Sequence, residues 1–156
     1  MEPSCAAQLA AVIRPIRLFS EHVMNEREKR KYLAELAGLA HDRELQLYLS
    51  ELENRFREWR QGTISSIELS DFIHEFHDGS ARAVYSTHIQ MKRDEVVARA
   101  IGVGLLREDE VPSEIREPLE GLVSHFRHTY QIDEHDPLAR LRSQTNLAET
   151  ERDAQE

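Results

Sequence analysis

The chain has 156 residues, of which 40% are hydrophobic and only 6% aromatic, a size and apolar share that suit one domain with a modest core. The few glycines and aromatics argue against β-sandwiches, barrels and doubly wound sheets. A net charge of −9 repels phosphate backbones and anionic lipids, so neither nucleic acid nor a membrane surface is an expected partner.

The two ends of the chain differ from its middle. Residues 1–23 are rich in alanine, interrupted by two prolines and only loosely periodic, so we expect a loosely ordered segment there. Asp136 and Pro137 end the last helical pattern, and the residues after them carry few large apolar side chains, which predicts a disordered tail over residues 137–156. A single helical domain is therefore expected over residues 24–136.

Two helices are predicted first, over residues 26–40 and 43–60. Asn25, followed three residues later by Glu28, has the pattern of a capping box for the first helix, and Asp42 can cap the second. Apolar residues of the second helix recur at intervals of three and four, like the seam that receives an antiparallel partner helix. We therefore predict an antiparallel helical hairpin within residues 26–60. The seam consists of Leu45, Leu49, Leu52, Phe56 and Trp59.

The rest of the domain also has helical patterns. Ser65 and Glu68 form a second capping box, for a helix that is expected to stop at Asp78 and Gly79. Further helices are predicted over residues 80–91, 95–106 and 115–130, with Asp94 as a cap for the middle one and Gly102 and Gly104 as its terminators.

No segment alternates in the manner of a β-strand. The predicted fold class is therefore all-α, an irregular bundle of five or six helices built on the antiparallel hairpin.

One helix face carries residues that could bind a metal. Asp71, His74 and Asp78 recur at spacings of three and four, and His77 could complete the set. Carboxylate and imidazole groups bind divalent transition metals, so Zn, Mn or Ni is the cofactor that this alternative implies. On a helical wheel, however, these residues lie opposite the apolar stripe of their helix, where acidic residues and histidines need no special cause.

Catalytic signatures are missing from the sequence. It contains no Gly-x-Ser-x-Gly nucleophile elbow, no phosphate-binding loop and no dinucleotide fingerprint. Two apolar residues, Leu47 and Ile67, fall on charged sides of their helices and are candidates for a partner surface.

A single cysteine, Cys5, leaves no internal disulfide and suits a reducing cytoplasm. The longest apolar stretch is far shorter than the roughly 20 residues of a membrane-spanning helix. These observations favour a small, soluble, cytoplasmic interaction or regulatory protein without enzymatic activity, and a homodimer is one form that such binding can take. The alternative is a divalent-metal-binding protein or metal-dependent enzyme that uses the acidic, histidine-bearing face of residues 68–78.

Overall fold

The computed structural model describes residues 24–129 and 138–139, so the expectations for residues 1–23 and for most of the predicted tail lie outside it. Helices dominate these described residues and none of them lies in a strand, which confirms the all-α prediction. Met24 and Leu138 are both buried in the hydrophobic core. The packed part therefore includes the predicted domain start and at least one residue of the predicted tail.

The longest element is α2 (Glu26–Arg60), a single helix of 35 residues that extends about 52 Å. The predicted capping box begins it. The Asn25 side chain accepts a hydrogen bond from the backbone amide of Glu28, and the Glu28 carboxylate accepts one from the amide of Asn25.

The predicted break at Asp42 is wrong, and with it the hairpin within residues 26–60. The Asp42 carboxylate is exposed and accepts a hydrogen bond from Nε2 of Gln46 at 3.0 Å, a pairing of residues four apart that fits a continuing helix. A residue that can cap a helix is also tolerated in its interior when its side chain faces water.

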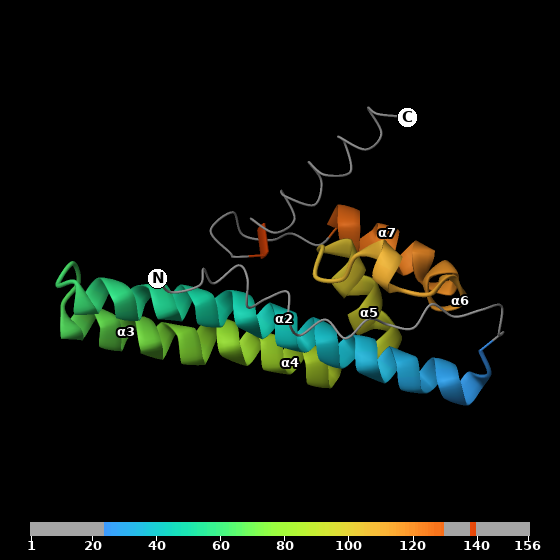
Figure 1. Cartoon of the computed structure of the whole chain (residues 1–156), viewed down its shortest axis with the longest axis horizontal. Coiled ribbons are helices and arrows are strands. Elements are labelled where there is room, and N and C mark those ends of the chain that lie inside the picture. Colours follow the sequence, from blue (N-terminus) through green and yellow to red (C-terminus); the bar gives the residue numbers. More distant parts are fainter. Residues whose placement is uncertain (1–23, 130–137, 140–156) are drawn as a thin grey trace, which may run out of the picture.

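The partner of α2 is a second long helical segment that runs back along it (Figure 1). This segment consists of α3 (Ser66–Phe76), the π-helical turn η1 (His77–Ala81) and α4 (Arg82–Gln90). Its start at the Ser65 capping box is as predicted. The predicted stop at Asp78 and Gly79 is wrong, because Gly79 does not adopt a positive φ and the π-helical turn carries the chain on into α4.

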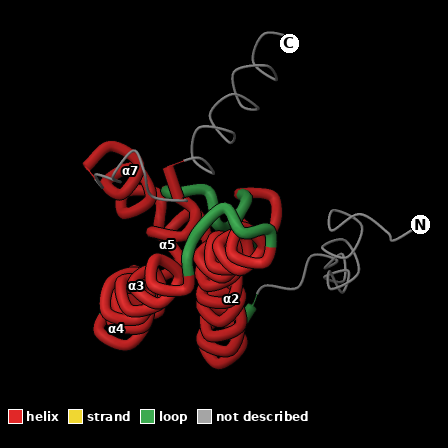
Figure 2. Tube along the Cα trace, turned by 90° about the vertical axis from the view of Figure 1, so that its left-hand side faces the viewer, coloured by secondary structure: helices red, strands yellow, loops and turns green. Residues whose placement is uncertain are grey.

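The remaining helices lie on one side of this pair (Figure 2). They are α5 (Arg93–Gly102), which packs against α2, and α7 (Glu120–Thr129), which packs against α5. Short turns connect them: η2 (Glu108–Glu110), α6 (Ser113–Arg116) and η3 (Glu117–Leu119).

The ends of α5 test two local predictions. The helix starts one residue before the predicted cap Asp94, which is therefore not its cap. Its end agrees with the prediction, because Gly102 is its last residue and Gly104 follows with φ +85°. Gly102 also permits the close approach of α7, since a Cβ atom there would lie 2.9 Å from the Cβ atom of Phe126.

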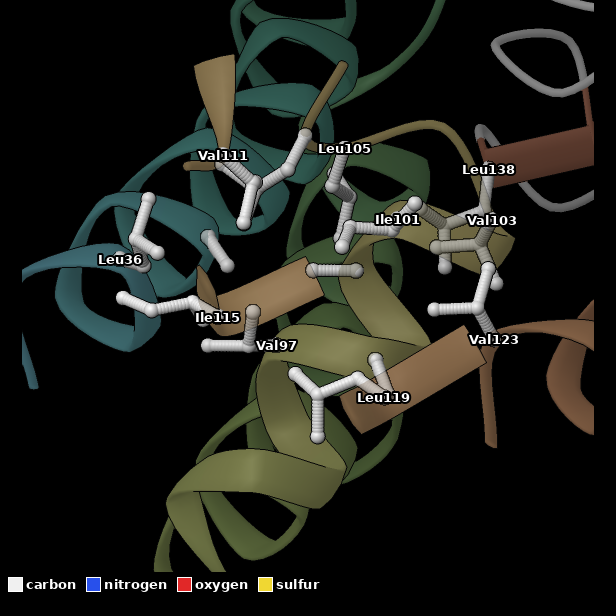
Figure 3. Close-up of a cluster of buried hydrophobic side chains, with 14 of the residues drawn as sticks. Leu36, Val97, Ile101, Val103, Leu105, Val111, Ile115, Leu119, Val123 and Leu138 are labelled. Carbon is white, nitrogen blue, oxygen red and sulfur yellow. The ribbon is translucent and has the colours of Figure 1, made fainter. Parts of the chain in front are cut away.

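Burial divides the described chain into two regions. We call residues 24–40 and 93–129 the head, and residues 41–90 the arm. All but one of the buried apolar residues in the main cluster belong to the head, and Figure 3 shows how they converge from α2, α5 and the segments that follow it. The cluster comprises Met24, Leu36, Ala40, Val97, Ala98, Ala100, Ile101, Val103, Leu105, Leu106, Val111, Ile115, Leu119, Val123 and Leu138.

Candidate functional site

The residues of the metal alternative lie on the outer surface of the arm. Asp71 and His74 belong to α3, His77 and Asp78 belong to η1, and all four are exposed. Nδ1 of His77 lies 3.0 Å from Oδ1 of Asp78. Within the described residues no group of three or more His, Cys, Asp or Glu side chains could hold a metal ion. The structure therefore pairs two of the four residues without assembling a site, and the Zn, Mn or Ni alternative stays a prediction.

The two residues expected on a partner surface have different surroundings. Leu47 is partly buried and packs against the core of the head instead of standing free on a charged side of α2. Ile67, at the start of α3, is 74% exposed. Its part in partner binding stays a prediction.

A broader apolar surface lies along the arm, and three consecutive residues of α2 show how it arises. Each is turned about 100° from the one before. The guanidinium of Arg43 reaches the head and donates to both carboxylate oxygens of Glu110 at 2.7 Å. Glu44 lies against His88 of α4. Leu45 is consequently turned to the side of α2 that faces away from the head.

The same relation holds farther along the arm. The guanidinium carbon of Arg55 lies 5.0 Å from the centre of the Phe72 ring, so this position marks the contact between α2 and α3. Phe56 and Ile73 each follow a contact residue and are turned to its flank. Both segments are right-handed helices and they run in opposite directions. In such a pair, the residue that follows a contact residue is turned to the same side of the pair in either helix.

Seven residues of α2, α3 and α4 therefore share one side of the arm, which we call the apolar face. Four of them are exposed: Tyr85 by 59%, Ile89 by 61%, Leu49 by 45% and Ile73 by 37%. The other three, Leu45, Leu52 and Phe56, are partly buried. A gathering of exposed apolar side chains marks a binding surface, whereas single ones are ordinary. The apolar face consists of Leu45, Leu49, Leu52, Phe56, Ile73, Tyr85 and Ile89.

The predicted seam of α2 therefore does not coincide with the residues through which α2 contacts the returning segment. Its residues Leu45 and Phe56 each follow a contact residue, Glu44 and Arg55. Leu49 and Trp59, which the seam places between helices, are both exposed. Nε1 of Trp59 donates to Oγ of Ser66 at 3.0 Å, which ties the two segments together at the tip of the arm.

A cluster of ionisable side chains is buried where the arm joins the head. Glu44 and Arg99 are each 2% exposed, and the guanidinium donates to both carboxylate oxygens at 2.6 and 2.9 Å. Nε2 of His88 lies 2.9 Å from Oε2 of Glu44, and the ring of His41 stacks on that of His88 with centroids 4.3 Å apart. The cluster joins α2, α4 and α5 at one point.

These surroundings shift the pKa of two groups. Burial alone raises the pKa of the Glu44 carboxyl, but hydrogen bonds from His88 and Arg99 outweigh burial and hold that pKa below its ordinary value. Burial and then the neighbouring His88 lower the pKa of the His41 imidazole. Glu44 is therefore a buried carboxylate with both oxygens engaged, an arrangement that holds helices together and offers no free oxygen to a substrate.

Sequence reasoning missed this cluster, although two signals for it exist. Glu44 continues a buried row of α2 in which every fourth residue, from Leu36 through Ala40 to Tyr48, faces inward. Arg99 interrupts the apolar run of α5. A lone charge in each of two buried stripes indicates that the two side chains meet.

Comparisons of the chain with protein-family models, with curated proteins and with solved structures found no match. None of the described helices combines the length and the apolar character needed to cross a bilayer.

Proposed function

We propose that this chain is a small, cytoplasmic interaction or regulatory protein without enzymatic activity, and that the apolar face binds its protein partner. The observation that carries the proposal is the gathering of seven apolar residues, from two antiparallel helical segments, on the side of the arm away from the head. The net charge of −9 disfavours nucleic acid as the partner, and the single cysteine suits a reducing compartment.

The composition of the face supports binding of a polypeptide. Leucine, isoleucine and tyrosine gain roughly 25 cal/mol for each Å² of apolar surface that a partner removes from water. Tyr85 has a hydroxyl group at the end of an apolar ring, a type of side chain that is enriched at the centres of protein interfaces. Two helical segments that lie side by side accommodate a partner helix with an apolar stripe between them.

Site-specific photocrosslinking in the native cells tests this proposal. Benzoylphenylalanine in place of Tyr85 is expected to give a covalent adduct with another polypeptide, because the ring lies on the apolar face. The same group in place of Ile67 is the matched comparison, since that residue is also exposed on the arm but lies off the face. The apolar face and the sequence prediction for Ile67 are therefore competing partner surfaces, and a strong adduct at Ile67 alone would favour the latter. Adducts that are absent at both positions, or equally abundant at both, contradict the proposal.

A further inference from the structure

We propose that the buried cluster at the junction of arm and head is a pH-sensitive contact, which releases the returning segment from α2 when His41 and His88 are both protonated. The two rings stack with their centroids 4.3 Å apart and their planes 12° apart, one on α2 and the other on α4. The pair therefore bridges the contact between α2 and the returning segment. Protonation of both rings sets two positive charges face to face across it.

The junction holds one buried negative charge, and that charge already has a counter-ion. Arg99 of α5 donates to both oxygens of the Glu44 carboxylate, and Nε2 of His88 shares one of them. Glu44 and Arg99 are each 2% exposed and the His88 side chain is 6% exposed, so water and salt screen further charge only weakly. Two imidazolium groups thus add two positive charges to an ion pair that is balanced without them.

The other charged groups around the two rings do not restore this balance. The charged groups on the neighbouring turns of α2 and at the start of α5 are Asp42, Glu44, Lys92, Arg93, Glu95 and Arg99. Asp42 is exposed to water, and the Glu95 carboxylate accepts a hydrogen bond from the amide of Lys92. Burial and then the charge of His88 lower the pKa of the His41 imidazole, and they outweigh the attraction of Glu44 and Asp42. His41 therefore binds a proton more readily when the rings are apart, so acid favours their separation.

The returning segment can move as a unit, because non-helical residues join it to the rest of the chain at both ends. Gly62, with φ +74°, lies in the loop before α3, and Met91 and Lys92 are extended between α4 and α5. The buried residues of α3 and α4 are Leu69 and Val84, whereas the last seven residues of α5 are all buried. Few buried contacts make local opening cheap, so the arm opens before the head unfolds.

Opening of the arm divides the apolar face. Tyr85 and Ile89 belong to α4, whereas Leu45 and Leu49 belong to α2. A partner that contacts both helices is therefore expected to bind less tightly in mild acid. This consequence rests on the proposed function, but the opening itself does not.

Hydrogen exchange of the full chain, followed by mass spectrometry, tests the opening between pH 7 and pH 5. The protection factors of the α4 amides, corrected for the effect of pH on the intrinsic exchange rate, are expected to fall about 5-fold to 25-fold. This range follows from one extra proton bound by the open form with an ordinary pKa of 6.5. The protection factors of the α5 amides are expected to change by less than about 2-fold.

Two histidine variants assign the effect to the stacked rings. His41→Phe keeps a ring beside His88 without the second charge, so the protection of α4 is expected to vary by less than about 2-fold over the same pH range. His74→Phe removes an exposed histidine of the same arm and is the matched control, which is expected to keep the wild-type pH dependence. Circular dichroism at pH 7 checks that both variants fold.

Several results would overturn the inference. Protection of α4 that rises in acid would show that the attraction between Glu44 and protonated His88 prevails over repulsion between the rings. Protection that falls equally in α4 and α5 would show unfolding of the whole domain, and a pH dependence that survives in His41→Phe would place its origin elsewhere. Protection of α4 that ignores pH overturns the release as well.

The outcomes separate this inference from the proposed function. Constant protection of α4 together with an adduct at Tyr85 overturns the pH-sensitive contact and leaves the apolar face as a binding surface. Acid-induced opening without any adduct at Tyr85 supports the contact and contradicts the proposed function.

Discussion

The head and the arm are built from the same kind of helix but bury their apolar residues to different degrees. The head closes a cluster of valines, leucines and isoleucines around α5, most of them less than 5% exposed (Figure 3). The buried apolar residues of the arm are Tyr48, Leu69 and Val84, whereas Leu49, Tyr85 and Ile89 are exposed to solvent. Two helices side by side cover only one stripe of each other, whereas a third layer closes a core. The head supplies the stability of the fold and the arm supplies surface.

The largest expected effect is at the junction of the two regions. Arg99→Leu leaves the buried Glu44 carboxylate without its guanidinium, and we expect a loss of about 3–5 kcal/mol in the free energy of unfolding. Urea denaturation followed by circular dichroism measures it.

The double variant Glu44→Leu with Arg99→Leu is the control, because it removes both charges and is expected to recover most of the loss. A single variant as stable as wild type would show that the buried ion pair does not hold the arm to the head.

A matched pair of leucines in α2 sharpens the contrast between the regions. Leu36 of the head is 2% exposed and Leu49 of the arm is 45% exposed. Leu36→Ala opens a cavity and is expected to cost about 2–5 kcal/mol, whereas Leu49→Ala is expected to change stability by about 0.5 kcal/mol or less in the monomer. Urea denaturation at low protein concentration compares the two, and equal losses would contradict the division into head and arm.

The smallest expected effect is a dependence of stability on pH at the same junction. The folded pKa of His41 lies below its ordinary value of 6.5, so as the pH falls below about 6.5 the unfolded chain takes up this proton first and stability falls. The charged and titratable neighbours are Asp42 and Glu44 of α2 and His88 of α4. The lowered pKa of Glu44 adds a second loss of stability as the pH falls below about 4.5.

Melting temperatures measured between pH 8 and pH 4 test this prediction. His41→Phe keeps a ring beside His88 without the titrating group, so its melting temperature is expected to depend less on pH between 7 and 5. A wild-type protein that becomes more stable as the pH falls through this range would show that the sign is wrong.

Local signals in the sequence located most helices but misjudged where they stop. The capping boxes at Asn25 and Ser65 are confirmed because each joins residues only three apart, and a sequence shows such neighbours directly. Asp42 and Gly79 carry equally ordinary stop signals, yet the helix continues through both. Packing of α2 along the returning segment and the head outweighs the preference of a single residue.

The sequence by itself determined the all-α class, the starts of α2 and α3 and the end of α5, because hydrogen-bonded caps and apolar periodicity act over a few residues. Only the tertiary structure decided that α2 is unbroken, which flank of it the head covers, and that Glu44 meets Arg99 from 55 residues away. The physical reason is that burial depends on what packs against a helix, and that neighbour comes from a distant part of the chain.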